Sequence, residues 1–211
     1  MNLHRIPPRS SSSSSTDHRE SATQRLFMRS GKSALRWAIC SMFLLIGCTG
    51  VPDGLEPVEG FETDRYLGVW FEIARLDHSF ERGLEDVSAT YTLREDGGLR
   101  VRNRGYDPEQ GEWREAIGRA YPLADPSVAS LKVSFFGPFY GGYHVIALDR
   151  ERYDAALVSG PSRDYLWVLA RERILERERK EALLESALAA GFDTGQLIWV
   201  KQTRRDPDLH R

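Results

Sequence analysis

The chain has 211 residues, of which 41% are hydrophobic and 28% are charged, and a formal net charge of −2. This composition is typical of one soluble domain with one core. Residues 48–211 hold 22 Lys and Arg against 29 Asp and Glu, a net charge of −7. That balance argues against nucleic acid as a partner, because a phosphate backbone requires a concentrated basic surface. Both cysteines, Cys40 and Cys48, lie in or beside one apolar run, so no disulfide can cross-link the domain that follows.

The first 47 residues have the composition of segments that lie outside a folded core. Residues 1–27 are rich in serine and charged side chains and poor in apolar ones, so we interpret them as a disordered N-terminal extension, or as untranslated sequence if synthesis starts at Met28. Residues 28–47 combine basic side chains with an apolar run over 37–47, which is the pattern of a signal peptide. That run is too short to span a bilayer, which takes roughly 20 helical residues.

The apolar run ends in Leu-Ile-Gly-Cys at 45–48. This tetrapeptide resembles the lipobox of bacterial lipoproteins, in which the cysteine is acylated and becomes the mature N-terminus. A plain secretory signal with an incidental cysteine is the alternative. In Gram-negative lipoproteins an Asp after the cysteine causes retention in the inner membrane, whereas this chain has Thr49. The resemblance therefore implies an outer-membrane protein anchored through Cys48, and residues 48–60 are expected to be the acylated cysteine and a tether.

Residues 60–171 break into short segments of alternating apolar and polar side chains, separated by Gly, Pro and Asp. This spacing predicts an all-β fold of eight antiparallel strands. After a first strand near 67–75, the expected strands cover 87–93, 99–104, 115–121, 131–136, 143–149, 155–159 and 165–171.

Alternation within strand 99–104 places three basic side chains on the outer face of the sheet. They are Arg100, Arg102 and Arg104. A charged stripe of this kind is usually a solvated surface, and we interpret it so; contact with anionic headgroups is the alternative.

The pattern changes after residue 171. Apolar positions between Ile174 and Leu188 suit one face of a helix, with Gly191 as its C-cap. The polar face mixes Glu with Arg, which favours packing against the barrel over binding to a membrane. Residues 196–201 are expected to form a short last strand.

The first predicted strand contains Gly68-Val69-Trp70. This Gly-x-Trp pattern resembles the signature of lipocalins, and Arg171 ends the eighth strand where lipocalins place an arginine that stacks on the tryptophan. The segments 80–84, 132–143 and 164–169 resemble the bacterial lipocalins, the Blc-type outer-membrane lipoproteins, which are related to apolipoprotein D and plant temperature-induced lipocalins.

This resemblance implies an eight-stranded antiparallel up-and-down barrel over residues 61–203, with the C-terminal helix packed outside it and a tail at 204–211. Gly68, Trp70 and Arg171 are its structural signature. The middle lipocalin motif, commonly Thr-Asp-Tyr, appears here as Leu-Asp-Arg at 148–150, so only Asp149 matches it.

Placing Trp70 and Arg171 inside the barrel fixes the alternation, and the resemblance extends it to the other strands. The candidate ligand-binding side chains are Tyr91, Asn103, Val133, Phe135, Tyr143, Val145, Tyr165, Trp167 and Leu169. Small residues at 116, 118 and 120 would leave room, and aromatic walls suit an acyl chain. The alternative is that these aromatic residues fill the core. Glu72 shares the inward alternation, so either it pairs with a buried donor or the alternation slips there.

The resemblance implies a lipid-binding outer-membrane lipoprotein that stores or transports a fatty acid or lysophospholipid in envelope maintenance. We find no catalytic constellation, no metal-ligand spacing and no phosphate-binding loop, so no catalytic residue, metal or cofactor is assigned. Neither His78 nor His144 has the context of a catalytic base. Two alternatives stay open: a lipocalin-fold enzyme acting on a lipophilic substrate, and a structural envelope lipoprotein with a filled barrel. A homodimer also stays open.

Overall fold

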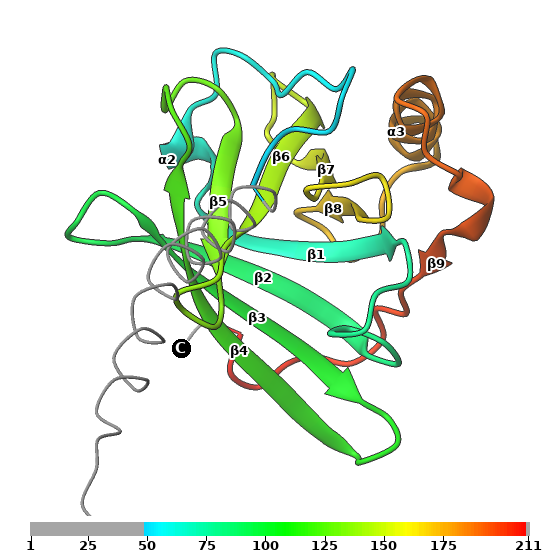
Figure 1. The fold of residues 1–211 in the computed structure, drawn as a ribbon. Helices are drawn as coiled ribbons and strands as arrows, with labels where there is room; N and C mark the ends of the chain where they lie inside the picture. The colour runs from blue at the N-terminus through cyan, green and yellow to red at the C-terminus, as the bar shows by residue number, and fades with distance from the viewer. Residues whose placement is uncertain (1–48, 210–211) are drawn as a thin grey trace, which may run out of the picture. The chain divides into compact units, whose positions relative to one another are not determined.

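The computed structural model describes residues 49–209, so the expected N-terminal extension, the signal peptide and Cys48 lie outside the described residues, as do residues 210–211. Nine strands in this part of the chain form one sheet (Figure 1). They are β1 (Gly68–Arg75), β2 (Glu85–Leu93), β3 (Leu99–Asp107), β4 (Glu112–Pro122), β5 (Ser130–Ser134), β6 (Gly141–Leu148), β7 (Ala155–Ser159), β8 (Leu166–Ala170) and β9 (Ile198–Trp199).

Strands β1 to β8 are antiparallel to their neighbours, and β1 pairs with both β8 and β2, so the sheet closes into a barrel. The short strand β9 extends the same sheet by pairing with the end of β1, beyond the residues that pair with β2. The predicted eight-stranded up-and-down barrel with a short final strand is therefore confirmed. Strands β3 and β4 form a longer hairpin than expected, because their pairing continues from Leu99 opposite Ala120 to Asp107 opposite Glu112.

The alternating strand directions put four loops at one end of the barrel, which we call the mouth. These loops cover residues 76–84, 108–111, 135–140 and 160–165. At the other end, the helix α2 (Thr63–Tyr66) precedes β1, and Phe61 and Tyr66 are buried against the barrel interior. We call this the closed end.

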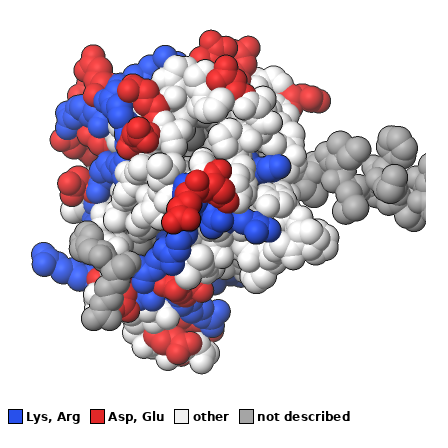
Figure 2. Space-filling view, turned by 90° about the vertical axis from the view of Figure 1, so that its left-hand side faces the viewer, with Lys and Arg blue, Asp and Glu red and all other residues white. Residues whose placement is uncertain are grey.

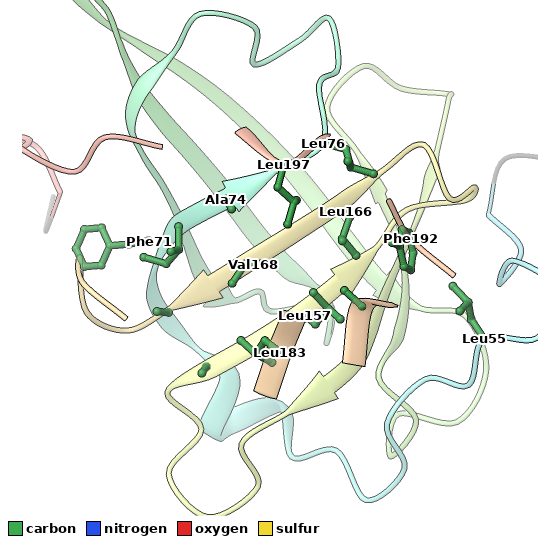
Figure 3. Close-up of a cluster of buried hydrophobic side chains, with 14 of the residues drawn as sticks. Leu55, Phe71, Ala74, Leu76, Leu157, Leu166, Val168, Leu183, Phe192 and Leu197 are labelled. Carbon is green, nitrogen blue, oxygen red and sulfur yellow. The ribbon is translucent and has the colours of Figure 1, made fainter. Parts of the chain in front are cut away.

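The core has two parts, one on each face of the sheet. The inner part fills the closed half of the barrel and includes Trp70, Tyr91, Val101 and Val145. The outer part lies on the other face of β1, β7 and β8, where Leu183 from the C-terminal helix packs with side chains of those strands (Figure 3). Burying each large apolar side chain contributes roughly 1.5–3 kcal/mol, so this contact holds the helix against the barrel.

That helix, α3 (Arg177–Ala189), ends where the sequence predicts. Gly191 has φ +81°, its N–H donates to Leu188 O at 3.0 Å, and the N–H of Phe192 donates to Ala187 O at 3.0 Å. These two bonds are a Schellman motif, which requires the left-handed conformation that glycine adopts without strain. A 3-10 turn, η2 (Thr194–Gln196), then leads to β9.

The segment expected to be a tether is packed on the barrel from residue 50 onward. Val58 donates its N–H to Val145 O at 2.8 Å and accepts one from Ala129 N at 2.9 Å, and Leu55 is buried in the outer core. Figure 1 shows these first described residues running alongside β6. The prediction of a tether over 51–58 is therefore wrong, because apolar side chains and strand-like hydrogen bonds fix the segment.

The arginine stripe faces outward as predicted, but the interpretation as a solvated surface is wrong for Arg102 and Arg104. Arg104 makes two hydrogen bonds of 2.7 and 2.8 Å to Asp206, and Arg102 donates to Asp208 O at 2.7 Å. The C-terminal residues 206–209 cover these guanidinium groups, and Asp206 itself is buried. The expected tail is thus part of the packed structure up to residue 209.

Candidate functional site

The closed end is built around Trp70, which has no exposed surface. Its indole N–H donates to Tyr66 O at 2.8 Å, and the guanidinium carbon of Arg171 lies 4.0 Å from the centroid of its ring. Arg171 also donates to Val69 O at 2.7 Å. Gly68 has φ +93°, and a Cβ there would be 3.4 Å from an Arg171 nitrogen. The three signature residues thus form one contact that closes the barrel, with the cation over the ring adding about 0.5–2 kcal/mol.

A layer of three tyrosines lies on the inner side of this plug. The hydroxyl of Tyr143 is 2.7 Å from that of Tyr66 and accepts a hydrogen bond of 2.8 Å from Tyr91. Burial raises the pKa of all three phenols, so they stay neutral. The layer therefore offers a ligand a neutral floor whose hydroxyl groups are largely satisfied by one another.

Between this floor and the mouth, inward-facing side chains keep part of their surface exposed. Val133, Phe135, Tyr143 and Trp167 all pack against the inner core, yet each is only partly buried. The closed end is therefore filled, whereas these side chains nearer the mouth keep some contact with solvent. We call the part of the interior between the floor and the mouth the open half.

Asn103 contributes a polar group to this open half. It pairs in register with Ala89 and Ala116, so its rung of the barrel carries small side chains on both sides. Its Oδ1 atom is buried and has no hydrogen-bond partner within the described residues. A buried acceptor without a partner costs about 1–3 kcal/mol, which a ligand hydroxyl or amine could recover.

The expectation that Gly118 leaves room for a ligand needs correction. A Cβ at Gly118 would lie 2.8 Å from the ring of Phe135 and 2.8 Å from Ser134 O. The space at Gly118 is thus occupied by Phe135, whose ring atoms Cδ1 and Cε1 lie against the β4 backbone. The glycine sets the position of one aromatic wall of the interior.

Charged side chains form a buried network near the mouth. Arg75 donates to Glu72 Oε1 at 2.6 Å and to Glu81 O at 2.7 Å. Burial, together with the charge of Glu81, raises the pKa of Glu72 well above its ordinary value. Both alternatives for Glu72 hold: it pairs with a buried donor, and the β1–β8 register shifts between Glu72 and Ala74.

The second half of that network reaches the candidate ligand site. Trp167 Nε1 donates to Glu81 Oε2 at 3.0 Å, and His78 Nε2 lies 3.1 Å from the same oxygen. Burial opposes ionisation of Glu81, but the contacts from His78, Trp167 and Arg75 outweigh it and lower the pKa of this carboxyl. The orientation of the Trp167 ring is therefore fixed by an ionised carboxylate.

All nine predicted ligand-binding residues lie on or beside the barrel interior. Three are fully buried in the inner core, namely Tyr91, Val145 and Leu169. Val133, Phe135, Tyr143 and Trp167 surround the open half, and Asn103 adds its amide. Tyr165 lies at the mouth, with its ring centroid 6.2 Å from that of Trp167.

Sequence reasoning missed His78 and Glu81 because they follow β1 in a loop, where strand alternation assigns no side. The spacing of a histidine and a glutamate three residues apart in a loop at the end of β1 was the available signal. His78 Nδ1 is buried and has no hydrogen-bond partner among residues 49–209, so it is a second polar atom that a ligand could contact.

One serine and one histidine are in hydrogen-bond contact, but on the outer face of the barrel. Ser130 Oγ is 2.8 Å from His144 Nδ1, and His144 Nε2 is 3.0 Å from Gly50 O. Because a carbonyl only accepts, Nε2 donates and Nδ1 accepts from the serine. Both side chains are buried beneath residue 50, away from the interior, and this pair therefore has a structural role.

The described residues offer few features of other functional classes. No group of three or more His, Cys, Asp or Glu side chains within 49–209 could hold a metal ion. No helix in that range has the length and apolar character to cross a membrane. Charged side chains of both signs are mixed over the face shown in Figure 2, without one continuous basic surface there.

Comparisons with known proteins agree with this geometry. The family model for the lipocalin-like domain matches residues 61–202. Outer membrane lipoprotein Blc of Citrobacter freundii is 54% identical over 167 residues, covering 78% of this chain and 94% of that protein. Temperature-induced lipocalin-1 of Arabidopsis thaliana is 36% identical, covering 73% and 86% respectively. Insecticyanin of Manduca sexta, at 19% identity, shares the fold with a TM-score of 0.60 over 74% of this chain and 88% of its own. The chain therefore belongs to the lipocalin family.

Proposed function

We propose that this protein is an outer-membrane lipoprotein, acylated at Cys48, that holds one fatty acid or lysophospholipid in the open half of its barrel for storage or transport in the envelope. The observation that carries the proposal is the partial exposure of inward-facing Val133, Phe135 and Trp167 above a closed floor. A site of this kind, apolar with a few polar groups, is typical of small-molecule binding.

The number of strands and the filled closed half favour a ligand with one acyl chain. An eight-stranded barrel encloses space for little more than its own side chains or one small ligand. Here the closed half is occupied by Trp70 and the tyrosine layer. The remaining open half suits a single chain, whereas a second acyl chain would have to stay outside.

Two polar atoms of the interior support a ligand that has a polar headgroup as well as an acyl chain. Asn103 Oδ1 and His78 Nδ1 are buried atoms without partners in the described chain. A hydroxyl or amine group of a lysophospholipid headgroup would donate to Asn103 Oδ1 while the acyl chain lies against Phe135 and Trp167. The names of the Blc relatives, which are outer membrane lipoproteins, support the location.

A titration of the chain without residues 1–48 tests the ligand proposal. Adding lysophosphatidylethanolamine or palmitate should change tryptophan emission and saturate at micromolar concentration. Phe135→Asp places an unpaired charge in the interior and should abolish the saturable change. Ile117→Asp is the matched control, because Ile117 is 49% exposed on neighbouring strand β4.

If neither lipid saturates the parent protein, or if Phe135→Asp binds as well as Ile117→Asp, the barrel is filled and the protein has a structural role. Recovery of the added lipid unchanged after prolonged incubation is expected; a hydrolysed or rearranged lipid would favour the enzyme alternative. The mass of the N-terminal peptide from native membranes checks acylation at Cys48.

A further inference from the structure

Exposed aromatic side chains gather at the mouth of the barrel. Among residues 49–209, four large aromatic side chains are exposed, and Phe80, Phe136 and Phe139 lie in mouth loops, at 57%, 80% and 68% exposure. The fourth, Trp199, lies in β9. The loop over 135–140, which we call the β5–β6 loop, reads Phe-Phe-Gly-Pro-Phe-Tyr and carries no charge.

Two of the three strand-connecting loops at the closed end have the opposite character. The β2–β3 turn contains Arg94, Glu95 and Asp96, and the β6–β7 turn contains a further run of charged side chains over 150–152. Leaving aromatic rings in water costs free energy in proportion to their apolar area. An apolar loop at one end and charged loops at the other indicate that the two ends face different surroundings.

The described chain begins beside the same loop. Thr49 O lies 3.2 Å from the position of a Cβ on Gly142, two residues after the β5–β6 loop ends, and Gly50 O is held by His144 at 3.0 Å. Thr49, the first described residue, therefore lies beside the start of β6 at the mouth. Because residues 50–58 are packed on the barrel, no free tether separates an anchor at Cys48 from the folded domain.

Two basic side chains stand behind the apolar loop. Arg119 and Lys132 lie over the ring of Tyr140, at 5.9 and 5.2 Å from its centroid. Neither makes an ion pair within residues 49–209, although the domain as a whole is acidic. In a phospholipid leaflet the acyl chains lie beneath anionic headgroups. The apolar loop would contact the acyl chains, and the two basic side chains would contact the headgroups.

From these placements, we propose that the β5–β6 loop inserts into the same leaflet that holds the acylated Cys48, so that the mouth faces the membrane and a single-chain lipid passes between leaflet and barrel without crossing bulk water. This inference rests on the proposed acylation and lipid binding. The other mouth loops carry charges, such as the exposed Arg82–Asp77 pair. The β5–β6 loop therefore enters the acyl region, while the other mouth loops stay among the headgroups.

The depth of the loop can be measured on the full-length protein, processed in Gram-negative cells and reconstituted into vesicles of phosphatidylethanolamine and phosphatidylglycerol. Acylation of Cys48 and removal of Cys40 leave no free thiol, so Phe139→Cys takes a single nitrobenzoxadiazole label. Leu93→Cys, 58% exposed at the closed end, is the matched control. Lipid-borne nitroxide should quench the label at 139 at least about twofold more than the label at 93, because only the former reaches the acyl region. Equal quenching, or stronger quenching at 93, would overturn the orientation.

A second variant tests the route of the ligand. Phe136→Ser with Phe139→Ser should slow transfer of fluorescent lysophosphatidylethanolamine from vesicles to the anchored protein by at least about tenfold, because the apolar contact of two rings with the leaflet is removed. Leu93→Ser should leave the transfer rate unchanged. An unchanged rate in the double variant contradicts the proposal.

The outcomes separate this inference from the proposed function. A protein that binds the lipid added from water but shows an aqueous label at 139 retains the function and loses the orientation. If the label at 139 is buried in the leaflet but the protein binds no single-chain lipid, the proposed orientation holds and the proposed function is wrong.

Discussion

Removing the ring of Trp70 should destabilise this protein more than any change at an exposed aromatic residue. Trp70 is completely buried, donates a 2.8 Å hydrogen bond to Tyr66 O and lies 4.0 Å from the Arg171 guanidinium. A buried tryptophan replaced by alanine costs about 3–5 kcal/mol in lost burial and cavity. Loss of the hydrogen bond and the cation–π contact brings the expected total to about 4–6 kcal/mol.

A cost of that size is a large part of the roughly 5–15 kcal/mol that stabilises a domain. Trp70→Ala should therefore lower the Tm by roughly 10–20 °C in a chain of this length. Circular dichroism during thermal and urea unfolding measures the change. Trp199→Ala is the control, because Trp199 is 47% exposed, and its loss should cost about 1 kcal/mol or less. Equal Tm values for the two variants would refute the assignment of Trp70 as the closing plug.

Three further predictions concern other parts of the structure. Burial lowers the pKa of His144. The contribution of the neutral imidazole to stability is therefore complete above the ordinary histidine pKa of about 6.5 and is lost as the pH falls. Between pH 7.5 and 5.5 the Tm of the parent should drop more than the Tm of His144→Asn. Asp206→Asn should lower the free energy of unfolding in urea by about 1–3 kcal/mol, since Arg104 stays buried with weaker contacts. The double variant Asp206→Asn with Arg104→Met should lose less free energy of unfolding than the two single variants added together. Tyr143→Phe removes the acceptor of Tyr91 and should also cost about 1–3 kcal/mol, whereas a loss near zero would show that water replaces that hydroxyl.

The strand pattern predicted the fold because barrel alternation is a local property. Side chains such as Val101 and Tyr91 alternate with polar neighbours, and both are buried inside. The Gly191 cap likewise follows from neighbouring residues. Where structure depended on one short stretch of chain, the sequence was sufficient to predict it.

Contacts between distant segments could not be predicted from the sequence in this way. Arg104 is outward by alternation but buried, because Asp206 returns to it from 102 residues away. Gly118 is small, yet the ring of Phe135 from the next strand fills its space. Residues 51–58 read as a tether because Pro and Gly are frequent there, although Leu55 and Val58 bind the segment to the barrel. In each case a partner far along the chain decided the environment.

Native mass spectrometry of the chain without residues 1–48, after incubation with lysophosphatidylethanolamine, tests the central claim most directly. Trp167 borders the open half of the barrel and is fixed by Glu81 at 3.0 Å, so Trp167→Asp should expel the ligand while the fold is retained. We expect a mass increase of one lysophosphatidylethanolamine per chain in the parent protein, none in Trp167→Asp, and none in the parent with a two-chain phospholipid. The parent without bound lipid, or Trp167→Asp with as much bound lipid as the parent, would contradict it.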